Sequence, residues 1–190
     1  MKLENVPTIR DLLDVAPAKH NDRTFIKYLR DGEIVEKKFS RVRSDGLAVC
    51  RKLRHDIGER NHIAIVSKST YEYIACMTGV LCSGNVAIPV DPDSTVSDTA
   101  AIINDSDATA VLYGAEFADK IEEVKALCPK LQYEMVISEE NFSKIYEEFS
   151  ETSEHAALSD YKMEPEKCAL IIYTSGTTGD KKGVMLSSEA

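Results

Sequence analysis

Short apolar segments alternate with longer amphipathic ones along most of the chain, and this alternation restricts the fold more than any other feature. Five segments rich in Val, Ile, Leu and Ala are expected to be buried strands: residues 62–66, 86–90, 109–113, 134–138 and 168–173. The segments between them are long enough for helical crossovers, which parallel strands require. The pattern therefore predicts an α/β fold with a mainly parallel sheet and helices on both faces.

Helical spacing of apolar residues fills the intervals between these strands. It predicts helices near residues 39–53, 73–81, 97–105, 117–124 and 142–149, with a short first helix at 8–16. We expect Ser40 to cap the first of the long helices. Residues 150–167 lack periodicity and carry many charges, so they are interpreted as a surface connection into the last strand.

Residues 24–39 follow a different pattern, in which apolar and charged residues alternate on both sides of Asp31-Gly32. This is typical of a β-hairpin with a tight turn. The length of 190 residues suits one domain with its own core. We therefore expect residues 1–190 to form a single α/β domain with a small hairpin near its start.

Composition excludes several classes of function. A net charge of −9 argues against nucleic-acid binding and against attraction to anionic membranes. The chain shows neither a signal-peptide pattern nor a run of about 18 apolar residues that could span a membrane. Its five cysteines include no Cys-x-x-Cys pair, which favours free thiols and a cytoplasmic location. Acidic residues between 134 and 166 are interpreted as a solvated face.

The segment after the last predicted strand concentrates the chemically informative residues. Residues 174–183 combine three glycines, four hydroxyl side chains and two lysines. In doubly wound α/β proteins, ligands bind where loops leave the carboxyl ends of strands. Glycines let backbone N–H groups approach an anion, and hydroxyls can donate to phosphate oxygens or ligate Mg²⁺. The segment predicts a loop that binds a polyphosphate.

Other motifs fit this loop less well. The P-loop pattern fails because Lys182 is followed by Gly183, and the dinucleotide fingerprint G-x-G-x-x-G is absent. The nucleophile elbow G-x-S-x-G fails because Tyr173 lies two residues before Ser175, so a nucleophilic Ser175 has no support. An ordinary surface turn needs only one or two glycines or prolines.

The sequence "YTSGTTGDKKGV" resembles the signature loop of the adenylate-forming superfamily, whose usual form is Y-T-S-G-T-T-G-x-P-K-G-V. The resemblance implies that ATP phosphates are bound by Thr174, Ser175, Gly176, Thr177, Thr178, Gly179, Lys182 and Gly183, with Thr178 a possible Mg²⁺ ligand. Two positions depart from the family pattern. Lys181 stands where the family has proline, and Ser187 is followed by Ser188 where the family usually has histidine.

Two further segments are similar to the family in the same order along the chain. Residues 70–92 resemble its helix followed by L-x-x-G-x-x-x-x-P-x-D-P, and residues 39–53 resemble its early aromatic-Ser/Thr helix. Gly84 and Pro89 within the first segment are expected to shape a turn from helix to strand. The resemblance therefore covers most of the chain, although its most specific part is the glycine-rich loop.

The resemblance implies a two-step reaction. A carboxylate attacks Mg-ATP, pyrophosphate leaves, and the acyl-adenylate is captured by coenzyme A or by the thiol of a carrier protein. The chain is most like a long-chain fatty-acyl-CoA synthetase, so a fatty acid is the expected substrate. The alternatives are an amino-acid adenylation domain and a non-catalytic phosphate-binding or interaction module.

The family's adenine- and ribose-binding segments and its C-terminal lid have no counterpart among these residues. We therefore interpret the chain as the N-terminal part of an AMP-binding domain. The resemblance places no catalytic residue in it, and we expect the 190 residues alone to lack adenylation activity.

Overall fold

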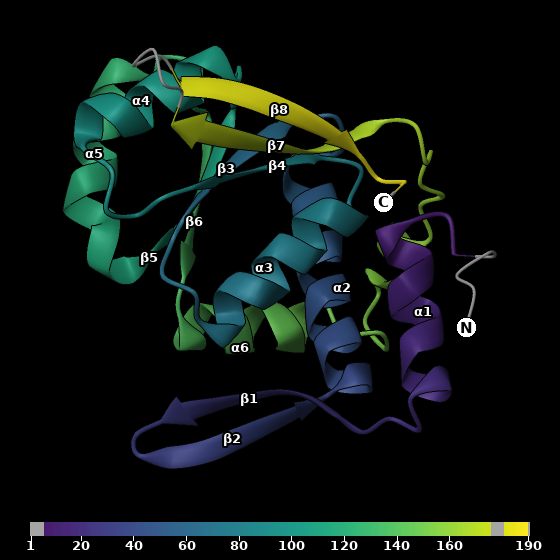
Figure 1. Ribbon diagram of the computed structural model, residues 1–190. Coiled ribbons are helices and arrows are strands. Elements are labelled where there is room, and N and C mark those ends of the chain that lie inside the picture. The colour runs from purple at the N-terminus through teal and green to yellow at the C-terminus, as the bar shows by residue number, and fades with distance from the viewer. Residues whose placement is uncertain (1–5, 176–180, 190) are drawn as a thin grey trace.

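The computed structural model describes residues 6–175 and 181–189, which form a layered α/β structure beside a small two-stranded ribbon (Figure 1). The strands of the main sheet are β3 (His62–Val66), β4 (Val86–Val90), β5 (Ala110–Gly114), β6 (Tyr133–Ile137), β7 (Cys168–Ser175) and β8 (Lys181–Ser187). Their spatial order is β6-β5-β3-β4-β7-β8. Strands β3 to β7 run parallel, whereas β8 pairs antiparallel with β7. The predicted mainly parallel sheet is confirmed.

Helices cover both faces of this sheet, as expected. One face packs against α2 (Phe39–Asp56), α3 (Tyr71–Cys82) and α6 (Glu139–Glu148), and the other against α4 (Val96–Asp105) and α5 (Ala118–Leu127). Helix α1 (Ile9–Lys19) lies outside α2 and α3. Two short 3₁₀ turns complete the described helices, at Ala115–Phe117 and Ala156–Ser159.

Alternation along the buried strands divides the core into two layers. Ile63 and Ile65 of β3 face the α2, α3 and α6 side, whereas Ala64 and Val66 face the α4 and α5 side. All four are fully buried. Successive residues of a strand point to opposite faces, so a strand buried on both sides is apolar throughout. This explains why the segment "HIAIV" is continuously apolar.

The contact between α2 and α3 depends on two glycines. A Cβ on Gly79 would lie 2.5 Å from Val49 Cβ and 2.9 Å from the backbone oxygen of Gly46. A Cβ on Gly46 would lie 2.4 Å from Thr78 Cγ2. The two helix backbones therefore approach more closely than any larger residue at position 79 would allow.

The predicted hairpin is confirmed as a ribbon of β1 (Thr24–Arg30) and β2 (Glu33–Lys38), separate from the main sheet. Its turn residues Asp31 and Gly32 both have positive φ, 52° and 83°, as a tight hairpin turn requires. Arg30 fixes the ribbon to the main body, because its guanidinium contacts Glu72 Oε1 and Glu139 Oε1 at 2.5 Å each. The ribbon thus rests on the first turns of α3 and α6.

The start of α2 differs from our expectation. Ser40 lies inside the helix, and the N-cap residue Lys38 makes no side-chain capping bond. Instead Asp22, in the connection between α1 and β1, accepts hydrogen bonds from Ser40 N and Ser40 Oγ, both at 2.8 Å. A capping carboxylate supplied from 18 residues upstream cannot be recognised from local sequence.

The Asp22 cap makes a testable contribution to acid stability. Its hydrogen bonds from Ser40 lower the pKa of Asp22 below the ordinary value of 3.8. Because the folded-state pKa is depressed, the stabilisation is present above pH 3.8 and is lost as pH falls through the folded-state pKa. We expect Asp22→Ala to lower the urea midpoint at pH 6, and the difference from the unmodified chain to disappear at the acid end of a pH series. A difference that persists at low pH would contradict this role.

Residues 150–167 are less superficial than expected. They contain only the 3₁₀ turn Ala156–Ser159, but this turn is held by the buried side chain of Arg51 on α2. Arg51 donates to the backbone oxygen of Phe149 at 3.0 Å, to that of Ala156 at 3.2 Å and to Ser159 Oγ at 3.1 Å. The connection is therefore fixed to the α2 layer before it enters β7.

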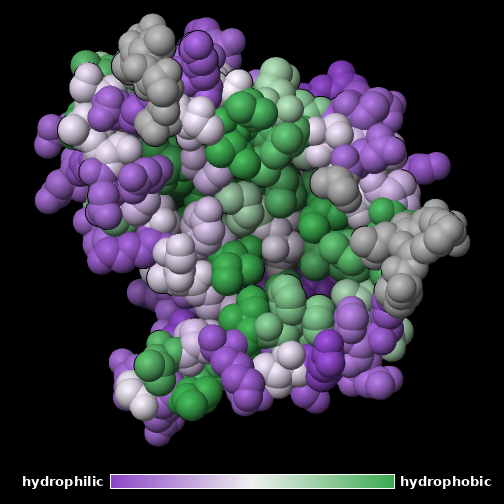
Figure 2. Space-filling view, viewed as in Figure 1, coloured by the Kyte–Doolittle hydropathy of each residue, from purple (hydrophilic) through white to green (hydrophobic). Residues whose placement is uncertain are grey.

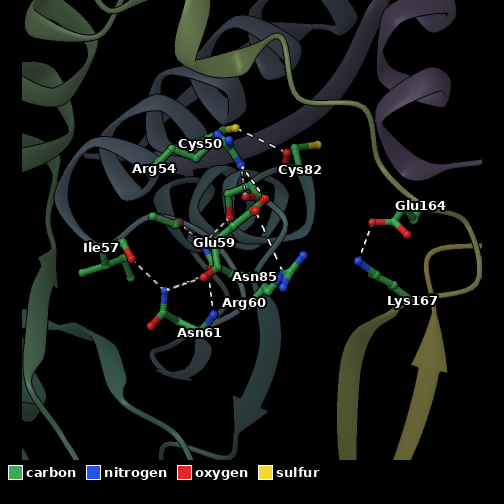
Figure 3. A network of polar contacts seen from close by, with 12 residues as sticks. Cys50, Arg54, Ile57, Glu59, Arg60, Asn61, Cys82, Asn85, Glu164 and Lys167 are labelled. Atoms are coloured by element: carbon green, nitrogen blue, oxygen red, sulfur yellow. Dashed lines mark hydrogen bonds and ion pairs between the residues drawn. The ribbon is translucent and has the colours of Figure 1, made fainter.

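Side-chain hydrogen bonds organise the amino edge of the sheet, where β3 and β4 begin (Figure 3). Asn85 Oδ1 accepts from the backbone N–H of Asn61 at 2.8 Å, and Asn85 Nδ2 donates to Gly58 O at 3.1 Å and to Ser83 Oγ at 2.8 Å. Arg54 Nη1 donates to Ser83 O at 2.9 Å. These groups use their polar atoms to hold two turns together, which is a structural role.

The two turn residues that we singled out in the middle of the chain have separate places. Gly84 lies in the turn between α3 and β4 with a φ of 78°, which confirms its expected role. The turn role expected for Pro89 is wrong, because Pro89 lies inside β4, opposite Ile65 of β3. Proline has no backbone N–H, so Pro89 cannot donate a hydrogen bond to a neighbouring strand. In the described residues, the pairing of β4 with β7 consists of Ala87 opposite Leu170.

Candidate functional site

Two neighbouring parallel strands, β4 and β7, end at the same edge of the sheet. The connection from Asp91 to Thr95 leaves β4 there, and the segment that joins β7 to β8 leaves β7 there. Loops at the carboxyl ends of parallel strands are the usual ligand-binding position in α/β proteins. This edge is therefore the candidate site.

The predicted loop is shorter than expected, because strand pairing continues into it. Thr174 and Ser175 belong to β7, whereas Lys182 and Gly183 belong to β8. We did not predict β8, because the sequence "KKGVMLS" lacks the regular alternation of a strand with one buried face. Of the remaining candidates, Gly176, Thr177, Thr178 and Gly179 lie outside the described residues, and so does the possible Mg²⁺ ligand Thr178.

Register gives the two strands of the hairpin a distinct open face. Thr174 lies directly opposite Lys182, and both are exposed. Residues opposite one another in an antiparallel pair project from the same face. The side chains of Thr174 and Lys182 therefore start from adjacent positions on one face, and they offer a donor and a cation suited to a phosphate oxygen.

The other face of the hairpin rests on α4. Tyr173 Oη donates to Asp105 Oδ2 at 2.5 Å, and Lys181 Nζ contacts Asp98 Oδ1 at 3.5 Å. Burial, followed by the bond to Asp105, raises the pKa of Tyr173, so the phenol stays protonated and keeps donating. Each strand of the hairpin is thus joined to α4 by one side chain.

Gly183 lies on this closed face, opposite Tyr173. A Cβ at this position would come within 3.0 Å of Ile171 Cγ2 and 3.0 Å of the Tyr173 ring. The absence of a side chain lets the Tyr173 ring lie across β8. Gly183 therefore has a packing role, whether or not its backbone also contacts a ligand.

The connection after β4 is fixed from α5. Lys120 Nζ donates to the backbone oxygens of Pro92 at 3.0 Å and Ser94 at 2.5 Å. Burial lowers the pKa of Lys120, and nearby carboxylates, first Asp91, oppose this effect. Thr95 then caps α4 by accepting from Asp98 N at 3.1 Å. The helix beneath the hairpin therefore begins at a fixed position.

Sequence reasoning missed three residues that support this edge from the helices: Asp98 and Asp105, which contact the hairpin, and Lys120, which holds the connection after β4. The pattern Thr95-x-x-Asp98 does mark the first turn of a helix. However, nothing in the local sequence links Asp98 or Asp105 to residues about 70 positions or more away. Only the fold brings them together.

Apolar residues surround the polar tip on the open face. Ile172, Val184 and Leu186 project from this face and are substantially exposed, whereas the exposed Met185 lies opposite Ile171 on the other face. Figure 2 shows this apolar surface over β7 and β8, with further apolar surface over α3. The polar pair Thr174 and Lys182 therefore lies at one end of a mostly apolar strip.

Residues 13–190 match the profile of the AMP-binding enzyme family, which decides the family. The chain belongs to the AMP-binding enzymes. It is 34% identical over 132 residues to a CoA ligase of Gibberella moniliformis, covering 68% of this chain and 20% of that protein. It is 33% identical over 131 residues to an L-proline--[L-prolyl-carrier protein] ligase of Pseudomonas fluorescens, covering 69% of this chain and 25% of that protein. This AMP-binding chain thus spans about a fifth to a quarter of these relatives.

Solved structures support the fold of this AMP-binding chain. The N-terminal domain of FACL13 from Mycobacterium tuberculosis matches with a TM-score of 0.77 at 19% identity, over 96% of this chain and 45% of that one. A long-chain-fatty-acid-CoA ligase, FadD1, from Archaeoglobus fulgidus matches with a TM-score of 0.77 at 21% identity, over 95% of this chain and 36% of that one. The described helices include none long and apolar enough to cross a bilayer.

Proposed function

We propose that the protein is an AMP-forming acid–thiol ligase, and that residues 1–190 are the N-terminal part of its AMP-binding domain. Membership of the family supports this, and the observation that carries it is the pairing of Thr174 with Lys182 on the open face at the carboxyl edge of the sheet. A cation and a hydroxyl side by side are suited to the pyrophosphate that leaves ATP when the acid is adenylated.

The proposed ATP ligands extend beyond the described pair to Ser175, Gly176, Thr177, Thr178, Gly179 and Gly183. In this proposal Mg²⁺ arrives with ATP as part of the substrate, and Thr178 contributes an oxygen to it. Backbone N–H groups of the glycines add further hydrogen-bond donors for the phosphate oxygens. These groups are neutral, so no carboxylate is needed to balance them. The chain as a whole is acidic, with a net charge of −9, so local groups must attract the anion.

A fatty acid is the favoured carboxylic acid, with coenzyme A as the favoured acceptor. The sequence resemblance and the 34% identical CoA ligase support this choice. An amino acid delivered to a carrier protein is the second candidate, because a carrier-protein ligase for L-proline is 33% identical over a similar length. Five free cysteines support a reducing, cytoplasmic compartment.

ATP–pyrophosphate exchange tests the proposal on the complete gene product. We expect exchange that depends on an added carboxylic acid, with long-chain fatty acids more effective than amino acids. Greater stimulation by amino acids would favour the carrier-protein reaction instead. No ATP–pyrophosphate exchange with any fatty acid or amino acid would contradict an adenylate-forming enzyme.

The same assay applies to the 190-residue chain alone. We expect it to show no exchange, because it spans less than half of the solved structures that share its fold. Exchange at a rate comparable with the complete protein would show that these residues already contain everything that adenylation requires.

A further inference from the structure

Two consecutive lysines, Lys181 and Lys182, begin β8 and project in opposite directions. We propose that Lys181 is a positioning residue, which holds the start of β8 on α4 through Asp98, while Lys182 is left to contact the phosphate. The inference rests on the proposed function for the ligand of Lys182, but the attachment to α4 can be tested without any ligand.

Strand register separates the two side chains. Lys182 lies opposite Thr174 on the exposed face, whereas Lys181 lies opposite Ser175, one residue along. Lys181 therefore shares the face of Gly183 and Tyr173, which lies against α4. Its Nζ reaches Asp98 Oδ1 at 3.5 Å. The direction of each lysine follows from strand geometry and does not depend on the residues between 175 and 181.

Helix α4 is a firm support for this contact. Its inner residues Ala100, Ile102 and Ile103 are buried in the core between the sheet and α5. Tyr173 already joins β7 to the last residue of α4, Asp105, at 2.5 Å. Asp98 lies two turns earlier on the same helix, so the two contacts hold the hairpin at two separated points. Two such points restrict both the position and the tilt of the paired ends of β7 and β8.

The residue type at position 181 gives the contact a particular purpose. In the signature loop that this chain resembles, proline stands at the corresponding position, and proline fixes φ near −65°. Lysine restricts φ less than proline does, so without another restraint position 181 would lose more conformational freedom when a ligand binds. The ion pair with Asp98 restores a restraint by another route, through the side chain.

Amide hydrogen exchange of the 190-residue chain tests the attachment. We expect Lys181→Ala and Asp98→Ala each to accelerate exchange of the β7–β8 amides by roughly two- to fivefold, as suits a half-exposed ion pair. The double variant should be no faster than either single one, because both remove the same contact. Lys182→Ala is the matched control and should leave the amide hydrogen exchange of β7 and β8 unchanged. Additive effects, or no effect of either variant, would overturn the attachment.

Binding of inorganic pyrophosphate, followed by ³¹P NMR on the same variants, tests the positioning role. Removing the carboxylate in Asp98→Ala makes the site less negative, so charge alone would tighten pyrophosphate binding. Positioning predicts the reverse, with binding weakened by roughly two- to fivefold. The double variant in which the two charges are swapped, Lys181→Asp with Asp98→Lys, should recover most of the pyrophosphate affinity that Lys181→Asp alone loses.

The possible outcomes distinguish the attachment of Lys181 to α4 from its role in positioning Lys182 for phosphate. Tighter or unchanged binding in Asp98→Ala, or no recovery in the charge-swapped double variant, would overturn the positioning role even if the hydrogen-exchange result stands. Absence of pyrophosphate binding by the unmodified chain at millimolar concentration would overturn the ligand assigned to Lys182, and with it the positioning role for phosphate. The amide hydrogen-exchange rates would then still decide whether Lys181 attaches the hairpin to α4.

Discussion

ATP–pyrophosphate exchange by the complete protein is expected to fall by about ten- to a hundredfold when Lys182 is replaced with alanine. A hydrogen bond to a charged group contributes about 1.5–3 kcal/mol, and about 1.4 kcal/mol corresponds to a factor of ten. Lys182 is exposed on the open face, so its replacement removes the proposed phosphate contact without disturbing the core. The thermal midpoint should therefore change little.

Lys182→Arg and Lys181→Ala are informative companions. Arginine keeps the charge but presents a planar, longer group, so we expect partial activity. Lys181→Ala should have a smaller effect than Lys182→Ala, because Lys181 faces α4. An exchange rate that is unchanged in Lys182→Ala would remove this lysine from the site. Equal losses in the two alanine variants would argue against the division between the two faces.

Replacing Gly79 with alanine is expected to destabilise the fold by about 2 kcal/mol. Overpacking costs about 1–3 kcal/mol, and the better helix propensity of alanine returns about 0.5–1 kcal/mol. The cost should lie near the upper end, because the new Cβ would meet both Val49, a β-branched residue, and the backbone oxygen of Gly46 at 2.9 Å. Chemical denaturation of the 190-residue chain would measure the loss.

Two further variants identify the cause. Gly46→Ala should cost less, because its close contacts would be with the side chain of Thr78 alone and the backbone oxygen of Ala75 would lie 3.8 Å away. Val49→Ala combined with Gly79→Ala should lose somewhat less stability than the sum of the two separate losses, because it removes the contact with Val49 Cγ1 while the contacts with the Cβ of residue 49 and with Gly46 O remain. A denaturation midpoint for Gly79→Ala equal to or above that of the unmodified chain would show that α2 and α3 can separate at little cost.

Much of the architecture could be predicted because the core strands are buried on both faces. Continuous apolar segments such as residues 62–66 and 86–90 can hardly be anything else between helical stripes, and the hairpin at Asp31-Gly32 is marked by its turn. The prediction failed where support comes from a distance. Ser40 has the right residue type for a cap, yet Asp22 provides the bond from a separate connection.

The candidate site shows the same division. The composition of residues 174–183 indicated phosphate chemistry, and the family match supports that reading. Strand β8 escaped prediction because an edge strand with an exposed apolar face lacks the usual alternation. Without β8, the two lysines appear equivalent. Their different directions follow only from the pairing of Thr174 with Lys182.

That pairing also bears on how the segment can change in length over evolution. Deleting one residue between β7 and β8, with the β7 register kept, would turn every side chain of the shifted β8 to the opposite face. Lys182 would then point at α4, and Gly183 would no longer lie under the Tyr173 ring. Substitutions between the strands leave this arrangement intact, whereas single-residue insertions and deletions reverse it. We therefore expect natural variants of this segment to differ in residue type and to keep a constant length.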